Sequence, residues 1–337
     1  MSLEKNYFEK YFFNHINRAA FKDVIGRSDF HIFGGTGALG LSLLYLFQHF
    51  DLTPASLTLY GRNSSKFNEW EKYAIDISIP FKSVKSESLN NVDLTSITKG
   101  STVIYFPGYA QPVKFMANPG SLFDLNITTL KNIIERAPRQ VFYSSTTEIY
   151  TGLSGRVAEE SHTVSTPSHP RGAYIESKRG GEAILAHCAL PNTRAVSFRV
   201  ALATPPSHIP GDNRILSDIV ASALNKHVIQ LKGGWDSIRQ YQWGPICIAK
   251  ILYSGFFGMQ NLYNIAGGES ITLGHLAQSV ACKLEVPYVN RVESSEQDIG
   301  APPSVDISTK RFEGEFSLAL PIESLHEMLD VYLQGVK

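Results

Sequence analysis

The stretch from Asp29 to Gly40 constrains the fold of this chain more than any other. It begins as a short apolar run, which predicts a buried strand, and it ends abruptly in glycines. The residues that follow, from Leu41 to Phe50, read as an apolar helix. A strand that turns at once into a helix needs glycine, because a Cβ would block the turn. We therefore expect a strand, a tight turn and a helix in direct succession.

The spacing of these glycines indicates what the turn can bind. Gly35, Gly37 and Gly40 fit G-x-G-x-x-G. Gly34, Gly37 and Gly40 fit the overlapping pattern G-x-x-G-x-x-G. Such a turn directs backbone N–H groups and the positive end of a helix at one point, which suits a pyrophosphate. The alternative is a tight turn without a ligand, but the flanking strand and helix favour a dinucleotide. The expected site comprises Gly34, Gly35, Thr36, Gly37, Ala38, Leu39 and Gly40.

Composition limits the classes of function. A chain of 337 residues can form one large domain or two coupled ones. Its formal net charge is +0, so neither nucleic acid nor an anionic membrane is an expected partner. Cys188, Cys247 and Cys282 are scattered, which argues against disulfides and zinc and suits a reducing cytoplasm. Because the sequence shows neither a signal-peptide pattern nor an apolar run of about 18 residues, we expect a soluble, cytoplasmic protein without a metal.

Residues 1–27 precede the glycine-rich stretch. Aromatic and aliphatic residues recur there at spacings of three and four, which predicts an amphipathic helix. We expect this N-terminal extension to cover the body of the domain or to contact another subunit, rather than to carry chemistry. The residues that form the pattern are Tyr7, Phe8, Tyr11, Phe12, Ile16 and Phe21.

A second strand is predicted at 56–60, and its end bears on the choice of cofactor. An NAD site usually places an acid there to hold the ribose 2′-hydroxyl. This chain has Arg62 instead, with no acid beside it. An arginine can pair with a 2′-phosphate, which slightly favours NADP over NAD. The alternative is a solvated loop arginine.

Strands and helices alternate in the next part of the chain. We expect a helix and a third strand within 63–100, a buried strand at 101–106, a helix at 122–137 and a further strand at 140–144. The alternation predicts an α/β fold with a Rossmann-like, doubly wound parallel sheet. Pro107-Gly108 ends one of these strands at the carboxyl edge, where open sheets of this kind bind ligands.

Hydroxyl side chains follow the strand at 140–144. Ser144, Thr146 and Thr147 can hydrogen-bond a substrate oxygen, and Glu148 beside them can act as an acid or a base. By itself the cluster is weak evidence, because Ser and Thr also cap the ends of helices.

A sharper pattern lies at the head of the next predicted helix. Tyr174 alone, of the 15 tyrosines, has a lysine four residues later, and that lysine is Lys178. One helical turn places the two side chains on the same face. A phenol with a pKa of about 10 is a poor base at neutral pH, but a nearby ammonium and a cationic nicotinamide both favour the phenolate. The alternative is an ordinary surface pair, which the preceding glycine site and hydroxyl cluster disfavour.

In this order, the motifs resemble those of the extended short-chain dehydrogenase/reductase family, specifically its nucleotide-sugar epimerase/dehydratase branch. The resemblance covers about residues 28–335. Residues 33–40 match the glycine fingerprint of the family. Thr146 stands where the family keeps a catalytic Ser or Thr, and Tyr174 and Lys178 match its catalytic pair.

The resemblance continues in the second half of the chain. Residues 238–243 resemble R-D-[FY]-[IV]-[HY]-V, and residues 263–268 resemble Y-N-[IV]-x-x-G. It implies that Arg239, together with Arg214, holds the diphosphate of a nucleotide sugar. It further implies cofactor contacts from Arg62, Pro107, Gly108, Ser144, Tyr174, Lys178 and Val200, and substrate contacts from Thr146 and Thr147.

Three departures from the family pattern concern the substrate more than the fold. Leu202 replaces an asparagine that commonly contacts the nucleotide sugar. Gln240 stands where an aspartate follows the diphosphate-binding arginine. Thr151 is inserted after the Ser/Thr-rich segment.

The reaction is less constrained than the family. Residues 145–150 resemble S-T-[DS]-E-[VL]-Y of 4,6-dehydratases and nucleotide-sugar decarboxylases, but Thr147 replaces the Asp that is the general acid in many dehydratases. A structural Glu148, bonded to backbone, is the alternative to a catalytic one. The resemblance implies that Tyr174 deprotonates a sugar C4 hydroxyl while Thr146 steadies that oxygen. Lys178 would hold the ribose and lower the pKa of the tyrosine.

Three functions follow from this site. We favour an NAD(P)-dependent nucleotide-sugar epimerase or dehydratase. The second is an NADPH-dependent reductase of an NDP-4-keto-6-deoxy sugar, which the NADP preference indicated by Arg62 favours. The third is a non-catalytic NADP-sensing regulator on the same fold, which would be expected to lose the Tyr174 and Lys178 pair.

We expect a dinucleotide-binding domain over residues 28–200, to which residues 236–266 return. A smaller substrate-binding α/β domain would comprise 201–235 and 267–335. The resemblance implies a homodimer formed by the helices near 121–137 and 172–188.

Overall fold

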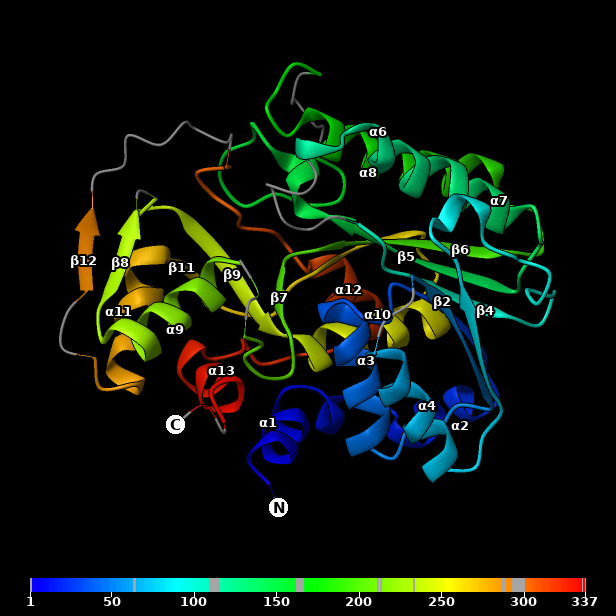
Figure 1. Ribbon diagram of the computed structural model, residues 1–337, viewed down its shortest axis with the longest axis horizontal. Helices are drawn as coiled ribbons and strands as arrows, with labels where there is room; N and C mark the ends of the chain where they lie inside the picture. The colour runs from blue at the N-terminus through cyan, green and yellow to red at the C-terminus, as the bar shows by residue number, and fades with distance from the viewer. Residues whose placement is uncertain are drawn as a thin grey trace.

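The computed structural model is an α/β protein with a large parallel sheet at its centre (Figure 1). It describes residues 2–62, 65–108, 116–161, 167–210, 212, 214–232, 234–286, 289–292, 301–334 and 336. The strands of the large sheet are β1 Asp29–Phe33, β2 Ser56–Gly61, β3 Phe81–Lys85, β4 Thr102–Tyr105, β5 Gln140–Thr146, β6 Arg194–Val200 and β10 Leu262–Ile265.

The order of these seven strands is β10-β6-β5-β4-β1-β2-β3, and neighbouring strands are parallel. The chain moves outward in one direction from β1 to β3 and in the other from β4, so the order reverses between β1 and β4. Open parallel sheets bind ligands at the carboxyl ends of their strands beside such a reversal. The predicted Rossmann-like, doubly wound sheet is confirmed.

Helices cover both faces of the large sheet (Figure 1). On one face lie α3 Ala38–His49, α4 Phe67–Asp76 and α10 Gly244–Phe257. On the other lie α6 Gly120–Phe123, the π-helical turn η3 Asp124–Thr129, α7 Leu130–Ile134 and α8 Gly172–Cys188. Two short 3₁₀ turns, η2 Leu89–Asn91 and η4 Thr147–Tyr150, join other elements.

The helix predicted at 122–137 differs from the observed one in two respects. It contains the π-turn η3, and it ends at Ile134 instead of Ala137. Ala137 has a positive φ of 55°, so it cannot continue the helix. Pro138 follows, and a residue before proline is sterically disfavoured in the helical region.

A smaller group of elements lies beside the large sheet, on the left of Figure 1. It contains the sheet β11-β9-β7 and the parallel pair β12-β8. The bounds are β7 Leu202–Thr204, β8 Ile229–Lys232, β9 Ile238–Trp243, β11 Ser270–Thr272, β12 Val289–Val292, α9 Ile215–Lys226 and α11 Leu273–Lys283; α12 Lys310–Phe316 and α13 Leu325–Tyr332 follow. Within 236–266, β10 joins the large sheet and β9 the small one. The division into domains at the predicted boundaries stays a prediction.

The N-terminal segment forms two helices instead of the single one predicted. They are α1 Leu3–Tyr11 and α2 Arg18–Gly26, separated by the 3₁₀ turn η1 Phe13–His15. The second helix starts anew because the Asn17 side chain accepts a hydrogen bond from the backbone N–H of Ala20. An N-cap signal of this kind overrides the apolar spacing that continues across it.

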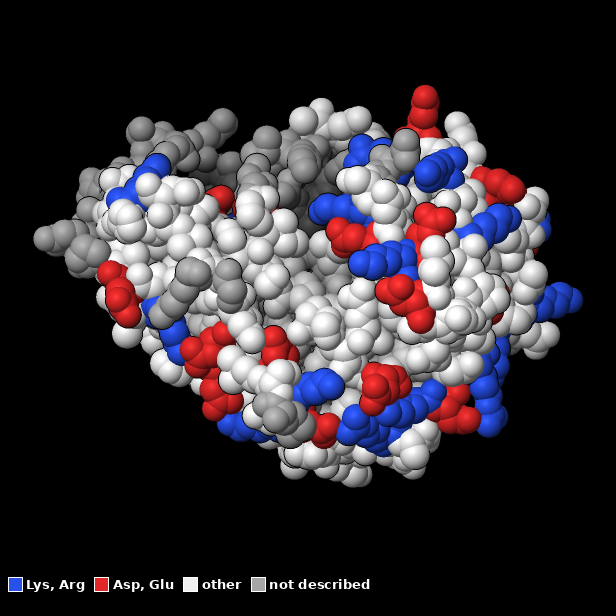
Figure 2. Space-filling model, turned by 60° about the horizontal axis from the view of Figure 1, so that its bottom comes forward, with Lys and Arg blue, Asp and Glu red and all other residues white. Residues whose placement is uncertain are grey.

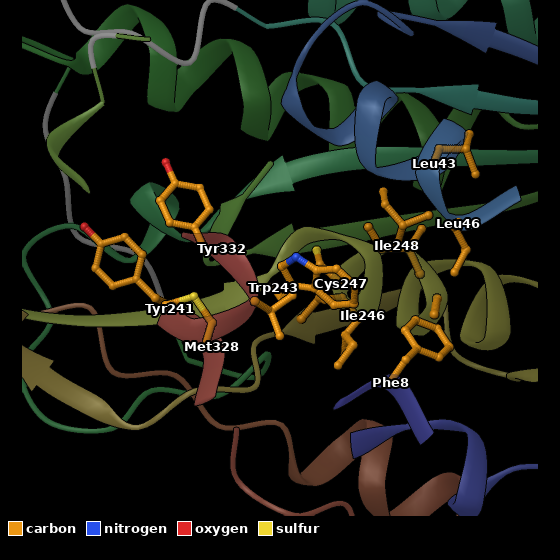
Figure 3. Packing of buried hydrophobic residues seen from close by; sticks show 14 of the residues in the cluster. Phe8, Leu43, Leu46, Tyr241, Trp243, Ile246, Cys247, Ile248, Met328 and Tyr332 are labelled. Atoms are coloured by element: carbon orange, nitrogen blue, oxygen red, sulfur yellow. The ribbon is translucent and has the colours of Figure 1, made fainter. Parts of the chain in front are cut away.

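The segment nevertheless covers the body of the molecule, as expected. Phe8 on α1 is fully buried, stacks on Phe50 at a ring-centroid distance of 4.1 Å, and meets the edge of Trp243. Figure 3 shows α1, α3 and α10 contributing to one apolar cluster around these rings. The buried apolar residues of α1 and α2 are therefore part of the core.

The surface gives no sign of a polyanion-binding face in the view of Figure 2. Basic and acidic side chains are interspersed there, in keeping with a net charge of +0. Among the described residues, no helix is both long enough and apolar enough to cross a bilayer.

Candidate active site

The glycine turn between β1 and α3 is shaped by close backbone packing. A Cβ on Gly35 would lie 2.3 Å from Leu59 Cδ1, and one on Gly40 would lie 2.3 Å from the carbonyl carbon of Gly35. Gly34 has a φ of +77° and faces the backbone of Pro107. A larger residue at Gly40 would clash with backbone, one at Gly34 would be strained by the positive φ, and one at Gly35 would require Leu59 to shift.

Gly37 is different, because a Cβ there would meet nothing closer than Gly34 O at 3.5 Å. Gly37 is exposed and is the N-cap of α3, with no side-chain hydrogen bond capping the helix that begins at Ala38. A glycine that packing does not require, at an uncapped helix start, leaves space for a bound anion. Thr36 and Leu39 are half-buried beside it. The turn therefore fits the pyrophosphate of a dinucleotide.

Lys178 occupies the carboxyl ends of β4 and β5. Its Nζ donates hydrogen bonds to the carbonyl oxygens of Pro107, at 3.0 Å, and Ser144, at 2.8 Å. A Cβ on Gly108 would lie 3.2 Å from the same Nζ. Burial lowers the pKa of Lys178 to about 7, and the charge of Glu182 opposes that shift. The structure thus brings together four of the residues predicted to contact the cofactor.

Tyr174 lies one helical turn before Lys178, near the side chain of Thr146 at the end of β5. Burial raises the pKa of its phenol, and the charge of Glu148 raises it further. The opposing effects come from the Thr146 hydroxyl and the charge of Arg171. We expected Lys178 to lower this pKa. Lys178 is not among the groups that shift this pKa, and its effect with a nicotinamide bound stays a prediction.

Glu148 belongs to η4 and is paired with Arg171, whose Nη1 donates to Glu148 Oε1 at 2.6 Å. The other carboxylate oxygen, Oε2, is buried and has no hydrogen-bond partner among the described residues. Burial raises the pKa of Glu148, whereas the charges of Arg171 and Arg239 lower it. The carboxylate is therefore bound by an arginine side chain. A purely structural Glu148 was expected to be bonded to backbone instead. Its second oxygen remains able to accept a proton.

The two arginines predicted to hold a diphosphate come from different elements. Arg239 on β9 is buried and donates to the carbonyl oxygen of Ile238 at 2.7 Å. Arg214, at the start of α9, is held by the carboxylate of Asp212, whose Oδ2 is 2.9 Å from Arg214 Nε. The charges of both arginines lower the pKa of Tyr241, so both lie near that residue. The carboxylate of Asp212 therefore compensates the positive charge of Arg214.

The remaining predicted residues lie along the same edge of the sheet. Val200 ends β6 and is the register partner of Thr146. Arg62 is exposed and directly follows β2. This strand pairs with β1, whose end begins the glycine turn. Thr147 is buried and faces a small cavity that Val305 and Ile307 also line, beside the Glu148 segment. Among the described residues, no group of His, Cys, Asp or Glu side chains is arranged to bind a metal ion.

Sequence reasoning missed three neighbours of these residues. Trp70 donates its indole N–H to Gly35 O at 3.1 Å and so supports the glycine turn. Arg171 pairs with Glu148, and Glu182 acts on Lys178. Glu182 could have been found by its spacing, because it follows Lys178 by four residues, as Lys178 follows Tyr174. The pairings of Trp70 and Arg171 leave no such local signal.

Comparison with known families decides where this chain belongs. The family model described as NAD dependent epimerase/dehydratase matches residues 31–243, from β1 to the end of β9. The chain belongs to the NAD dependent epimerase/dehydratase family. This confirms the resemblance seen in the sequence. No curated protein matches the chain.

Solved structures of members of this family have the same fold. A UDP-N-acetylglucosamine 4-epimerase from Methanobrevibacter ruminantium M1, in complex with UDP-N-acetylmuramic acid, superimposes with a TM-score of 0.75 at 17% identity, over 91% of this chain and 99% of that one. The dTDP-glucose 4,6-dehydratase DesIV from Streptomyces venezuelae, solved with NAD, gives 0.73 at 16% identity, over 91% and 97%.

MoeE5, in complex with UDP-glucuronic acid and NAD, gives a TM-score of 0.74 at 14% identity, over 91% of this chain and 98% of that one. At such low identities the similarity concerns the fold. It extends over nearly the whole length of each chain.

Proposed function

We propose that this protein is an NAD(P)-dependent nucleotide-sugar epimerase or dehydratase that oxidises its substrate at the sugar C4 hydroxyl. The observation that carries the proposal is the position of Tyr174 near Thr146 at the end of β5, with Lys178 at the neighbouring strand ends. A phenol and a hydroxyl that lie near one another can both contact one substrate oxygen.

The residues around the glycine turn fit a dinucleotide. The turn at Gly37 would receive the pyrophosphate, and Lys178, with further donor capacity on its Nζ, would hold the ribose of the nicotinamide. When bound, the nicotinamide supplies the acceptor for a hydride. Arg62 favours NADP slightly over NAD, because its exposed guanidinium lies at the end of β2 where a 2′-phosphate would lie.

The substrate side of the site supports a nucleotide sugar. Arg239 would hold the diphosphate, and Arg214 would contribute less because Asp212 compensates its charge. Tyr174 would accept the proton of the C4 hydroxyl while Thr146 donates a hydrogen bond to that oxygen. Glu148, through its unpartnered oxygen, would remove a proton from a neighbouring carbon in a dehydratase. In an epimerase it would stay a neighbour of Tyr174.

The proposal includes a cytoplasmic homodimer formed by α8 and the helices at 120–134. A reductase of NDP-4-keto-6-deoxy sugars remains the second candidate, favoured by Arg62 and its indication of NADP.

The test is incubation with a panel of UDP- and dTDP-sugars, including 4-keto-6-deoxy forms, with NAD or NADP(H). Nicotinamide absorbance is followed, and the products are examined by mass and NMR. Conversion without net change in cofactor supports the proposal: unchanged mass indicates epimerisation, and loss of water indicates dehydration. Stoichiometric consumption of NADPH by one substrate would establish the reductase instead. Cofactor binding without turnover of any sugar would favour a non-catalytic sensor.

A further inference from the structure

We propose that Glu182 is a positioning residue that fixes the end of β5 beside Tyr174 and Lys178. Glu182 lies one helical turn beyond Lys178 on α8. The role assigned to Lys178 in holding a ribose rests on the function proposed above. The effect of Glu182 on the charge of Lys178 does not, and it can be measured in the protein alone.

The carboxylate of Glu182 is fully engaged by two neighbouring strands. Its Oε1 accepts hydrogen bonds from Ser145 Oγ on β5, at 2.6 Å, and from Arg199 Nε on β6, at 2.9 Å. Its Oε2 accepts from Arg199 Nη2 at 2.7 Å. The two-point pairing of a guanidinium with a carboxylate is rigid, and only 12% of the Glu182 side chain is exposed. Glu182 therefore has a defined position.

The hydrogen bond between Ser145 and Glu182 fixes a part of β5 in which the residues before and after Ser145 both belong to the site. The preceding residue, Ser144, offers the carbonyl oxygen that Lys178 Nζ contacts at 2.8 Å. The following residue, Thr146, lies near Tyr174 and lowers the pKa of its phenol. A shift of Ser145 would move both contacts together. Loss of the Glu182 carboxylate thus acts on Tyr174 and Lys178 without touching either side chain.

Arg199 extends the same connection to the segment that carries Glu148. Its Nη1 donates to the hydroxyl oxygen of Tyr150, at 2.8 Å, and Tyr150 ends η4. The Tyr150 hydroxyl in turn donates to Asn264 Oδ1 on β10, also at 2.8 Å. One carboxylate on α8 thereby joins β5, β6 and η4 at the carboxyl edge of the sheet.

Glu182 also supplies the negative charge that Lys178 needs. Lys178 is 2% exposed, and burial favours its neutral form, whereas the charge of Glu182 favours the ammonium. Loss of this negative charge would therefore shift Lys178 toward the neutral amine, which donates fewer hydrogen bonds.

The other charged and titratable groups around Lys178 are accounted for. α8 packs against β5, β6, η4, α6, η3 and α7. The helix itself carries Tyr174, Glu176, Arg179, Glu182, His187 and Cys188, and the elements packed against it carry Tyr143, Glu148, Tyr150, Arg194, Arg199, Asp124, Lys131 and the cap residue Glu135. The Tyr143 ring lies 4.9 Å from Lys178 Nζ, but its buried phenol has a raised pKa and stays neutral.

The experiment is NMR titration of the lysine side chains in protein labelled at lysine Cε, with the Lys178 signal assigned through Lys178→Arg. Glu182→Gln is expected to lower the Lys178 midpoint by about one pH unit. Glu182→Asp, which keeps the charge, restores a midpoint close to that of the wild type. The matched control is Glu176→Gln, which removes another carboxylate from α8, one that lies 3.6 Å from Arg179.

A second variant guards against misfolding, because Glu182→Gln leaves Arg199 buried without a counter-charge. The double variant Glu182→Gln/Arg199→Gln removes one negative and one positive charge, so its Lys178 midpoint should lie closer to that of the wild type than the midpoint of Glu182→Gln does. The proposal is overturned if Lys178 keeps its wild-type midpoint in Glu182→Gln, or if Glu176→Gln shifts it equally. The readout needs neither cofactor nor substrate, so its result is separate from the fate of the proposed enzyme activity.

Discussion

At the scale of single residues, the glycines of the turn have two different tasks. Gly35 and Gly40 are required by packing, whereas the Cβ position of Gly37 is open. Gly37→Ala should therefore leave the melting temperature unchanged and weaken NAD(P) binding at least about tenfold, because a methyl group occupies the space of the pyrophosphate. Titration of cofactor fluorescence measures the affinity. Gly314→Ala, also in open space, is the control and should bind cofactor normally.

Arg62 decides between two cofactors in this account. Arg62→Ala should weaken NADP binding by about ten- to a hundredfold and leave NAD binding within about twofold, because only NADP carries the 2′-phosphate. Competition binding of both cofactors to the wild type and the variant measures the ratio. Equal losses for NAD and NADP would contradict the assigned role, and Arg27→Ala, on an exposed arginine paired with Asp23, is the control.

How far single residues can be predicted depends on whether their partners are local. Tyr174 and Lys178 are recognisable because a helix converts a spacing of four into a shared face. The Arg171–Glu148 pair joins two segments that are 23 residues apart, so no periodicity reveals it. The orientation of Lys178 toward carbonyl oxygens also depends on the ends of two strands. The pKa of Tyr174 could not be anticipated for that reason.

At the scale of elements, the start of β1 carries a buried polar cluster. His31, 1% exposed, lies between Asp29 and Tyr60, with Nε2 to Asp29 Oδ2 at 2.9 Å and Nδ1 to the Tyr60 hydroxyl at 2.8 Å. The hydrogen bond with His31 lowers the pKa of Asp29 most, and a bond from Ser56 adds to the effect. The native state therefore favours the carboxylate form of Asp29 over the acid.

This cluster predicts a pH dependence of stability. A carboxyl group whose pKa is depressed on folding stabilises the native state above its unfolded pKa, about 4, and loses that contribution as the pH falls through the folded value. The melting temperature should thus decline below about pH 4, and Asp29→Asn should flatten that decline. Thermal denaturation between pH 2 and 7 tests it. Asp51→Asn, at an exposed aspartate, should leave the profile unchanged.

Elements were predictable where the apolar pattern is uninterrupted. The strands β1 and β4 are read directly from short apolar runs, because a central parallel strand is buried on both faces, whereas β2 is read from alternating apolar residues. The break between α1 and α2 follows from a single capping residue, and the π-turn η3 has no pattern of its own. Local hydrogen bonds decided these two cases.

At the scale of the whole molecule, a buried ion pair joins the two ends of the chain to α10. Lys250 Nζ lies 3.2 Å from Glu323 Oε1, and Glu323 Oε2 accepts from the Tyr7 hydroxyl at 2.9 Å and from the backbone N–H of Trp243 at 3.1 Å. Glu323 is 1% exposed. The contact holds α1 against the body of the molecule, as its apolar pattern predicts, although the sequence does not reveal the pairing of Tyr7 with Glu323.

Removing one member of this pair should be costly. Glu323→Ala leaves Lys250 buried without its partner and should lower the free energy of unfolding by about 3 to 5 kcal/mol. Urea denaturation measures the change, and Glu269→Ala, at an exposed site, should alter it by less than about 0.5 kcal/mol. A Glu323→Ala protein as stable as the wild type would show that the pair contributes little to joining these segments.

The central claim is that Tyr174 moves the proton in an oxidation of the sugar. The most direct measurement compares the wild type with Tyr174→Phe, using the nucleotide sugar that the panel identifies, and records turnover and cofactor affinity in the same preparations. Tyr73→Phe is the control, because its buried hydroxyl has no partner among the described residues. The account predicts at least about a hundredfold loss of turnover in Tyr174→Phe with cofactor affinity retained, and normal turnover in the control. Full turnover by Tyr174→Phe would contradict the account.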